Sequence, residues 1–524
     1  MSSKINKETS MPAFQTLVLK INRKFPLLFL SAILFAAPFL FPYLFFTAWV
    51  ALVPFFWLVG RSKSMGQAFF LGWLMGWMTN LIGFYWLAHT ISVFGEFPYL
   101  VGLVIFLIFA ALEASQFAVF AVLARRFGSG PLFVIPALFW VALEFWFPHL
   151  FPWYLASSQT QFLPLVQSGD IFGPYGTSLL LLWLNRILYR LLCPAAEKSR
   201  GVVFPAAIFG FLVIAAVIYG QIRISSLMAA MARAPEVNGA AIQGNIDIML
   251  KWDPTKWRRN LSSYQELTKA AKGASLVIWP ETAVEPWIPD DIRKLPSELQ
   301  SALPQGVAFF IFGARSFLGQ PGGNDFKAFN SAFLADGHGR ILGRYHKQVL
   351  MAFGEYIPFS AILSKIPGVP NFGDGFSGGD GPHTLDLSDS VRIALLICYE
   401  DLIPPLARAF VSQGRANLLV NLTNDAWYGD TVAPWQHLRL AEWRAIETRR
   451  YLVRATNTGV TAVIDPRGVP VGVLPIFSPG VLSAKAKILD GETLYVRFGD
   501  WFAWLITFMA AAVVLRGIFL EKKV

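Results

Sequence analysis

Apolar residues are distributed unevenly along the chain, and this distribution limits the folds it can adopt. Long runs with few charges fill residues 26–220, a stretch of ordinary polarity follows, and a last apolar run covers 502–515. A helix that crosses a bilayer core needs about 20 apolar residues. Only 15% of the 524 residues are charged, whereas soluble domains average roughly 25%. We therefore predict a membrane domain, a large soluble domain and a terminal anchor.

Eight membrane-spanning helices account for the apolar runs. We predict them at residues 26–41, 43–59, 67–88, 98–123, 131–147, 175–192, 203–220 and 499–516. The chain then divides into an N-terminal segment, a membrane domain of seven spans, a soluble domain, a last span and a tail, at residues 1–25, 26–220, 221–497, 498–516 and 517–524. Glu113, Gln116 and Glu144 fall inside predicted spans, where polar side chains are functional candidates by default.

Basic residues predict the orientation of these spans, because short cytoplasmic connections collect Lys and Arg. Lys and Arg lie before span one and after spans two, four and six, whereas the connections near 42, 89–97 and 148–174 contain none. Both termini are therefore predicted to be cytoplasmic and residues 221–497 to lie outside. A cleaved signal peptide ending near Ala36 and Ala37 is the alternative. Much of the net charge of +11 follows from this topology, and we expect no nucleic-acid partner.

The soluble domain is predicted to be an α/β domain. Short apolar strands alternate with helical or loop stretches, at residues 240–243, 276–279, 307–313, 331–334, 391–397, 418–422, 452–455 and 460–464. Such alternation favours sheets covered by helices. Residues 435–450 mix apolar and charged side chains, which is typical of a surface helix. The glycine- and proline-rich residues 357–382 form a long loop, for which we prefer a lid or a lipid-facing arm over a disordered linker.

Cys398 follows directly on the predicted strand 391–397, and it is one of only two cysteines. The other, Cys193, lies at the cytoplasmic end of span six, so the two cannot pair. An unpaired thiol in an extracytoplasmic domain is a candidate for reactivity. A cysteine held at a strand end suits nucleophilic catalysis, while a small buried hydrophobe is the alternative.

Two further segments, each at a strand end or in a loop, supply candidate partners for this thiol. A thiol is only a few per cent ionised at neutral pH, and Glu281 is a candidate base. Lys347 is a candidate for stabilising the oxyanion of a tetrahedral intermediate. His346 is an alternative base. Taken singly, Glu281 also fits a helix N-terminus, Lys347 a solvated charge and Glu400 a surface ion pair.

At these residues the chain resembles the carbon-nitrogen hydrolase (nitrilase) superfamily. The resemblance covers Pro280-Glu281, Lys347 with Gly354-Glu355-Tyr356-Ile357-Pro358 downstream, Cys398-Tyr399-Glu400, and residues 421–427. It implies an αββα sandwich and a Glu-Lys-Cys triad, with Glu281 as general base, Lys347 as stabiliser of the intermediate and Cys398 as the acylated nucleophile. It further implies supporting or substrate-binding roles for Glu355, Tyr399, Glu400, Trp252 and Trp427.

With seven spans before that domain and one after it, the whole chain resembles the apolipoprotein N-acyltransferase family of the bacterial inner membrane. The resemblance implies transfer of an acyl chain from a phospholipid, expected to be phosphatidylethanolamine, through a Cys398 thioester to a diacylated apolipoprotein, with the catalytic domain in the periplasm. No metal or nucleotide cofactor is expected, because the histidines are scattered and no phosphate-binding glycine motif precedes a helix. A membrane-tethered amidase or nitrilase is the nearest alternative, and a transporter with an inactive outer domain is another.

Overall fold

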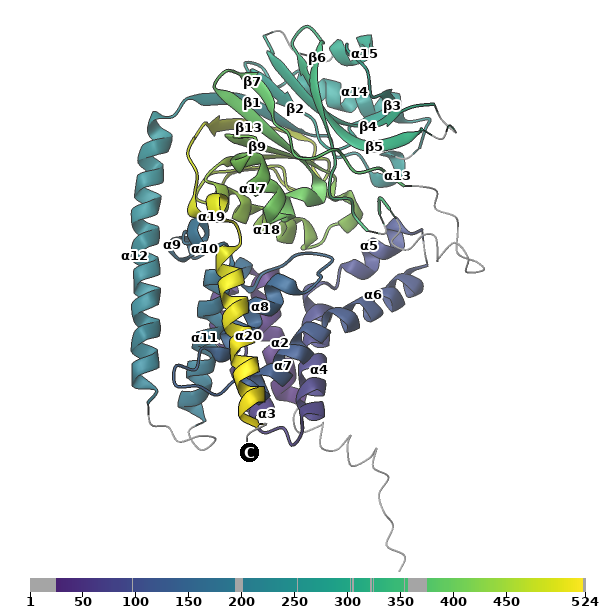
Figure 1. Ribbon diagram of the computed structural model, residues 1–524. Coiled ribbons are helices and arrows are strands. Elements are labelled where there is room, and N and C mark those ends of the chain that lie inside the picture. Colours follow the sequence, from purple (N-terminus) through teal and green to yellow (C-terminus); the bar gives the residue numbers. More distant parts are fainter. Residues whose placement is uncertain are drawn as a thin grey trace, which may run out of the picture.

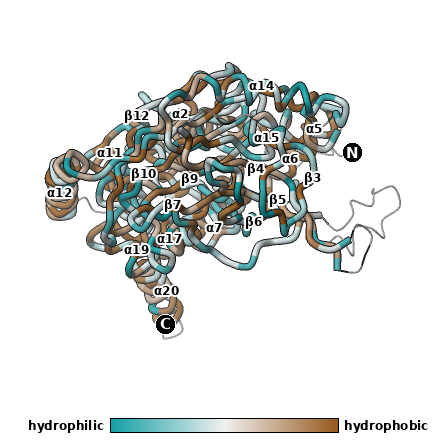
Figure 2. Tube along the Cα trace, turned by 90° about the horizontal axis from the view of Figure 1, so that it is seen from above, coloured by the Kyte–Doolittle hydropathy of each residue, from teal (hydrophilic) through white to brown (hydrophobic). Residues whose placement is uncertain are grey.

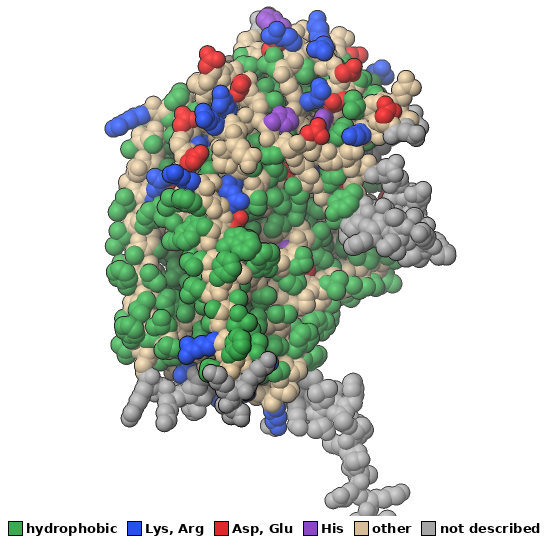
Figure 3. Space-filling view, viewed as in Figure 1, with side chains coloured by type: hydrophobic (Ala, Val, Ile, Leu, Met, Phe, Trp, Pro, Cys, Tyr) green, Lys and Arg blue, Asp and Glu red, His purple; other side chains and the backbone are tan. Residues whose placement is uncertain are grey.

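The protein has a helical bundle at one end and a two-sheet domain at the other (Figure 1). The computed structural model describes residues 25–96, 98–193, 201–251, 253–301, 303, 306–320, 323, 325–352, 354–356 and 375–521. Hydrophobic side chains form a broad band over the bundle, and charged side chains gather mainly on the two-sheet domain, with a few at the opposite end of the bundle (Figure 3). This band is the surface that a bilayer would cover.

Each predicted span contains helix. The bundle consists of α2 (Phe25–Leu40), η1 (Pro42–Trp49), α3 (Val53–Gly60), α4 (Met65–Gly83), α5 (Leu87–Phe94), α6 (Tyr99–Glu113), α7 (Ser115–Phe127), α8 (Ile135–Trp146), α11 (Tyr175–Leu192), α12 (Val203–Arg233) and α20 (Trp501–Glu521). Short helices η2 (Leu155–Gln159), α9 (Leu163–Val166) and α10 (Gly169–Phe172) lie between α8 and α11. Among the described residues, four helical stretches have the length and apolarity to cross a membrane: Pro42–Gly60, Tyr99–Phe127, Val203–Arg233 and Trp501–Leu520.

Aromatic side chains fill the centre of the bundle. The Trp140 ring lies edge-on against Phe35 and Phe117, with centroids 5.7 and 5.1 Å apart. Gly76 on α4 allows α7 to approach closely, since a Cβ atom there would lie 2.7 Å from the Phe117 ring. Small residues commonly permit such helix contacts in membranes. Several helix boundaries differ from the predicted spans, most of all that of α12, which continues to Arg233 where the predicted span ends at 220, because apolar residues extend past the predicted span.

Two sheets form the other domain. The first has the order β13-β1-β2-β4-β5-β6 with β3 on β4, and the second the order β12-β11-β10-β9-β8-β7. The first sheet contains β1 (Glu236–Gln243), β2 (Leu276–Ile278), β3 (Val284–Pro289), β4 (Phe309–Leu318), β5 (Lys327–Asp336), β6 (Ile341–His346) and β13 (Gly480–Lys487). The second contains β7 (Leu385–Ser388), β8 (Val391–Ile397), β9 (Leu418–Thr423), β10 (Tyr451–Thr456), β11 (Ala462–Ile464) and β12 (Pro470–Val473).

The two sheets share one apolar core. Ile278 and Leu334 of the first sheet belong to the same buried cluster as Leu395 and Val420 of the second. Helix α14 (Trp257–Thr268) packs against the first sheet, and α17 (Pro404–Ser412) and α18 (Ala433–Thr448) pack against the second. Seen from above, the apolar strands β9 and β10 lie inside the outline, with α12 at its edge (Figure 2). Every predicted strand is present, and β8 has the predicted bounds.

The prediction of a surface helix at 435–450 is wrong, because α18 is buried between the second sheet and the membrane bundle. Trp443, Arg444 and Glu447 are each at most 1% exposed. Charged side chains are buried only when they are paired, and an Arg444 Nη2 to Glu447 Oε1 ion pair of 2.9 Å satisfies this condition. The soluble domain therefore rests on the bundle through a helix that carries buried charges.

Candidate active site

The fold brings the three predicted catalytic residues together at strand ends. Glu281 follows β2, Lys347 follows β6, and Cys398 follows β8 as the first residue of η4 (Cys398–Leu402). The first two belong to one sheet and the third to the other, so the site joins both sheets. Lys347 Nζ lies 3.9 Å from Glu281 Oε1, and both charges act on the Cys398 thiol.

The backbone turns sharply at the candidate nucleophile. Cys398 has a φ of +52°, a conformation that costs a non-glycine residue about 1–3 kcal/mol and that concentrates at active sites. Asn421 Nδ2 donates a 3.0 Å hydrogen bond to the Cys398 carbonyl and holds this turn. A similar constraint surrounds the base: a Cβ atom on Gly313 of β4 would lie 2.7 Å from Glu281 Cα, so only glycine fits there.

Lys347 is held by two carboxylates. Its Nζ lies 2.7 Å from Glu355 Oε2, and its side chain is 2% exposed. Asn330 of β5, which sequence reasoning missed, donates 2.7 Å hydrogen bonds from Nδ2 to Glu281 Oε1 and Glu355 Oε1. Met351 N also donates to Glu355 Oε2, at 2.8 Å. The arrangement fixes the Lys347 ammonium between the carboxylate of Glu281, the candidate base, and that of Glu355. The only sequence signal for Asn330 is a polar residue beside the apolar stretch 331–334.

Burial dominates the protonation states of the site. Burial raises the pKa of the Glu281 carboxyl, although the charge of Lys347 opposes the rise. Burial and the charge of Glu281 both raise the pKa of the Cys398 thiol, so the resting nucleophile is protonated. For Lys347, burial lowers the pKa, but the charges of Glu355, Cys398 and Glu281 raise it further, so the ammonium persists. The site therefore combines a protonated thiol, a carboxyl with raised basicity and a permanent cation.

Glu400 ties the lysine segment to the cysteine turn. Its Oε1 accepts hydrogen bonds from Tyr345 Oη, Gln348 N and Val349 N at 2.9, 2.6 and 3.1 Å, and its Oε2 accepts one from Ile397 N at 2.8 Å. Its side chain is fully buried. Burial raises the pKa of Glu400 to about 7, while the bond from Ile397 lowers it. The alternative of a surface ion pair is therefore wrong for this residue.

Comparison with known proteins identifies the family. Residues 239–488 match the carbon-nitrogen hydrolase family model, and residues 31–187 match the model of the apolipoprotein N-acyltransferase N-terminal domain. An apolipoprotein N-acyltransferase of Geobacter metallireducens is 35% identical over 91% of both chains. The chain belongs to the apolipoprotein N-acyltransferase family. Relatives with that name in Haemophilus ducreyi and Pseudomonas syringae are 30% and 31% identical, over 89% and 86% of this chain and 90% and 88% of theirs. The predicted resemblance and the acyltransferase class are thereby confirmed.

The turn that begins at the candidate nucleophile (η4, Cys398–Leu402), which we call the catalytic turn, contacts the membrane bundle. Tyr399 Oη donates a 2.6 Å hydrogen bond to the Leu150 carbonyl, in the connection between α8 and α11. The Trp427 ring lies 4.5 Å from Phe94 of α5, between centroids. Trp252, the other predicted aromatic, lies outside the described residues, as do residues 357–374 of the predicted lid. Two of the predicted supporting residues thus face the membrane domain.

A second charged cluster lies behind the nucleophile, and sequence reasoning did not find it. His437 of α18 places Nε2 2.8 Å from Asp401 Oδ1 and Nδ1 2.9 Å from Asp425 Oδ1. Arg454 of β10 pairs with Asp401 and lies 3.8 Å from Asp425. All four side chains are at most 4% exposed. We call these four residues the sealed cluster. Asp401 lies three residues after Cys398, so the cluster holds the catalytic turn against α18.

The side chain of His346, the alternative candidate for the base of Cys398, is bound to other residues. Its Nδ1 bonds to Ser331 Oγ at 2.8 Å, and its Nε2 lies 3.2 Å from Asp290 Oδ1. Both ring nitrogens are therefore engaged. Within the described part of the chain, no group of three His, Cys, Asp or Glu residues has an arrangement suited to a metal ion.

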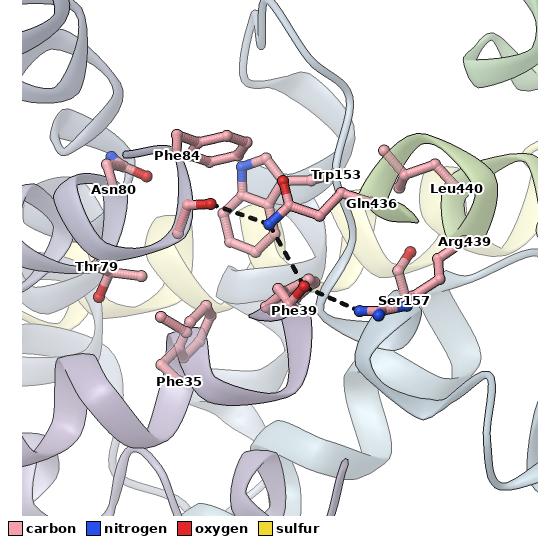
Figure 4. A pocket seen from close by; sticks show the side chains of 12 residues that line it. Phe35, Phe39, Thr79, Asn80, Phe84, Trp153, Ser157, Gln436, Arg439 and Leu440 are labelled. Atoms are coloured by element: carbon pink, nitrogen blue, oxygen red, sulfur yellow. Dashed lines mark hydrogen bonds between the residues drawn. The ribbon is translucent and has the colours of Figure 1, made fainter. Parts of the chain in front are cut away.

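An apolar pocket lies where α18 meets the bundle (Figure 4). Phe35, Phe39, Phe84 and Trp153 supply much of its wall, and Gln436 and Arg439 of α18 supply its polar edge. Gln436 Nε2 donates to the Gly83 carbonyl at 3.0 Å, and Arg439 Nη1 donates to the Phe39 carbonyl at 2.9 Å. The last carbonyls of a helix lack partners within the helix. Gln436 and Arg439 of the two-sheet domain thus satisfy backbone carbonyls at the ends of α4 and α2. The cavity beside them is apolar and matches an aliphatic chain in polarity.

Proposed function

We propose that the chain is a phospholipid:apolipoprotein N-acyltransferase. It moves an acyl chain from a phospholipid to Cys398, and then to the free amino group of the diacylglyceryl-cysteine of an apolipoprotein. The observation that carries this proposal is the buried Lys347 Nζ, 3.9 Å from Glu281 Oε1, beside the Cys398 thiol in a member of this family. The adjacent membrane bundle gives this site access to lipid esters.

The first step forms a thioester. Glu281 accepts the thiol proton as Cys398 Sγ attacks the ester carbonyl of the phospholipid, and the Lys347 ammonium stabilises the oxyanion that develops. When the carbon–oxygen ester bond breaks, Glu281 returns the proton to the leaving oxygen. The products are acyl-Cys398 and a lysophospholipid. The raised pKa of Glu281 makes it a better base than an exposed carboxylate.

The second step forms an amide. The amino group of the acceptor attacks the thioester carbonyl, Lys347 again stabilises the oxyanion, and Glu281 accepts the proton that the amine loses. The carbon–sulfur bond then breaks and Cys398 regains a proton. Water must be kept from the thioester, and a site closed by the membrane domain favours the amine over hydrolysis.

Supporting residues have defined tasks in this scheme. Glu355 holds Lys347 through its 2.7 Å ion pair. Glu400 fixes the segments of Lys347 and Cys398 relative to each other, and Tyr399 connects the turn to the bundle. Trp427, whose ring packs on Phe94 of α5, is proposed to border the lipid approach, and a substrate-binding role is proposed for Trp252 as well.

The architecture proposed for this function has eight spans and an αββα sandwich, with the domain boundaries predicted from the sequence. The positive-inside pattern supports cytoplasmic termini and a periplasmic catalytic domain in a bacterial inner membrane. Phosphatidylethanolamine is the proposed donor and a diacylated apolipoprotein the proposed acceptor.

Purified protein in detergent, phosphatidylethanolamine and a diacylated lipopeptide test the proposal. We expect the lipopeptide to gain the mass of one acyl chain, and Cys398→Ala to abolish this gain. Release of free fatty acid with an unmodified lipopeptide would instead support the amidase-like hydrolase. If the Cys398→Ala variant keeps the cellular function of the wild-type protein, the result would support a transporter with an inactive outer domain.

A further inference from the structure

A second pocket lies beside the catalytic turn, at the end of the bundle that faces the two-sheet domain. Its wall includes Glu144 near the end of α8, His149 and Trp153 of the following connection, Tyr175 at the start of α11, and Tyr399 of the catalytic turn. It therefore adjoins the residue that follows the nucleophile. Nothing in the mechanism above uses Glu144 or His149.

Glu144 presents an unpaired carboxylate oxygen in this wall. Its Oε1 accepts hydrogen bonds from Trp140 Nε1 at 2.9 Å and from Leu155 N at 2.7 Å. Its Oε2 is buried and has no hydrogen-bond partner in the described part of the chain, and the residue is only 4% exposed. An unpaired buried carboxylate oxygen is costly, so its retention points to a partner that arrives from outside.

His149 presents a second acceptor in the same wall. Its Nδ1 lies 2.7 Å from Glu113 Oε2, and Leu150 N donates to Glu113 Oε1 at 3.4 Å. With Nδ1 as the donor to Glu113, Nε2 is the ring nitrogen that can accept a hydrogen bond from a ligand. Nε2 is buried and also has no partner among the described residues.

Aromatic rings complete the enclosure. The Trp153 ring centroid lies 5.7 Å from that of His149, and the rings of Tyr154 and Tyr175 meet edge-on at 5.6 Å. The rings of Trp153, Tyr154, Tyr175 and Tyr399 all line the pocket. No Lys or Arg appears among its described lining residues. Aromatic faces attract ammonium groups, and carboxylate and imidazole acceptors match their N–H donors.

We propose that this pocket binds a primary ammonium group of a substrate. The inference rests on the proposed function, in which two substrates carry a primary amine: the ethanolamine head group of the donor and the α-amino group of the acceptor. A quaternary ammonium would leave Glu144 Oε2 and His149 Nε2 without donors, so the pocket distinguishes amines from their fully methylated forms.

Glu144→Gln tests this inference in two half-reactions, since it removes the charge but retains an oxygen for Trp140 and Leu155. Acyl-enzyme formation is measured with phosphatidylethanolamine and, separately, with phosphatidylglycerol, which has no amine. Acyl transfer to a diacylated lipopeptide is measured from enzyme acylated beforehand. Loss of a charge-assisted hydrogen bond predicts a fall of about tenfold or more. A fall confined to phosphatidylethanolamine assigns the pocket to the donor, and a fall confined to transfer assigns it to the acceptor.

Three rates within twofold of wild type, or an equal loss of all three, would overturn the inference. His149→Phe removes the second acceptor but retains an aromatic ring, and it must affect the same half-reaction, which keeps the test decisive if Glu144→Gln fails to fold. Thr47→Val is the control, because Thr47 is a buried polar residue of η1 whose hydroxyl is already bonded to the Leu34 and Leu44 carbonyls at 2.8 and 2.9 Å, and it does not line the pocket. We expect it to leave the three rates in their wild-type ratio. Failure of the wild type to acylate Cys398 from either lipid would contradict the proposed function instead.

Discussion

The catalytic cluster and the sealed cluster are both buried groups of charges, but their charges balance differently. In the first, Lys347 faces the two carboxylates of Glu281 and Glu355. In the sealed cluster, His437 and Arg454 face Asp401 and Asp425, so two cations meet two anions. The catalytic cluster has one carboxylate in excess.

The protonation equilibria follow this difference. In the catalytic cluster burial raises the pKa of Glu281, and the charge of Glu355 also raises it, because one ammonium serves two carboxylates. In the sealed cluster burial also opposes ionisation, but His437 and Arg454 overcome it and lower the pKa of Asp425. An unbalanced cluster can exchange a proton during turnover, whereas a balanced one holds its charges and fixes the chain around them.

The largest effect should follow from removing the excess carboxylate. Glu281→Gln deprives the thiol of its base, and we expect acyl-enzyme formation to slow by about 10²- to 10⁴-fold. Rapid-quench mass spectrometry of the acyl-enzyme measures this rate. Glu285→Gln is the control, because Glu285 is also a buried carboxylate but is bound by Asn260 at 2.9 Å. Equal losses in the two variants would contradict the role of Glu281.

Unbalancing the sealed cluster should cost stability. Arg454→Met leaves two carboxylates facing one cation, and loss of one partner from a buried ion pair costs about 3–5 kcal/mol. Denaturant titration of the purified protein in detergent measures the free energy of unfolding. Arg392→Met breaks the exposed pair with Asp386, whose side chains are 41% and 64% exposed, and should cost at most about 1 kcal/mol. Similar losses of unfolding free energy in the two variants would contradict the stabilising role of the sealed cluster.

The sealed cluster also predicts how stability depends on pH. Burial lowers the pKa of His437, but Asp401 and Asp425 raise it to about 9 in the folded protein, against about 6.5 unfolded. The resulting stabilisation, on the order of 3 kcal/mol, is fully present below pH 6.5 and is lost as pH rises through 9. Melting temperatures between pH 6 and 10 measure it. His437→Gln should flatten the decline, and an unchanged decline in that variant would contradict the assignment.

A smaller effect should follow from Asn330→Ala. The Asn330 amide lowers the pKa of Glu281, so its removal raises that pKa and leaves Lys347 with looser partners. We expect about a tenfold loss of rate at neutral pH. The acidic limb of the pH–rate profile should also move to higher pH, which a purely structural defect would not cause.

Sequence reasoning found the residues whose positions depend on local pattern. Apolar runs predicted the bundle because each span must satisfy its own backbone, and the strand 391–397 was predicted because every residue in it but Arg392 is apolar. Strand ends that carry Glu281, Lys347 and Cys398 indicated a site, because such ends meet in space. These predictions needed no knowledge of which elements pack together.

The residues that were missed depend on tertiary pairing. The charges of α18 predict a surface helix, since the i,i+3 spacing of Arg444 and Glu447 fits an exposed ion pair as well as a buried one. The sealed cluster joins residues 401, 425, 437 and 454 from four elements, and Asn330 is one of several polar residues in β5, so its sequence does not single it out. Whether a buried charge is satisfied is decided by the fold, which a linear pattern does not contain.

Intact-mass measurement of the enzyme, given phospholipid without acceptor, tests the central claim most directly. The account predicts that the protein gains the mass of one acyl chain, that this mass is lost on treatment with neutral hydroxylamine as for a thioester, and that Cys398→Ala gains nothing. Added lipopeptide should remove the acyl chain and acquire it. Absence of acylated Cys398 under conditions in which the wild-type enzyme turns over would contradict the account.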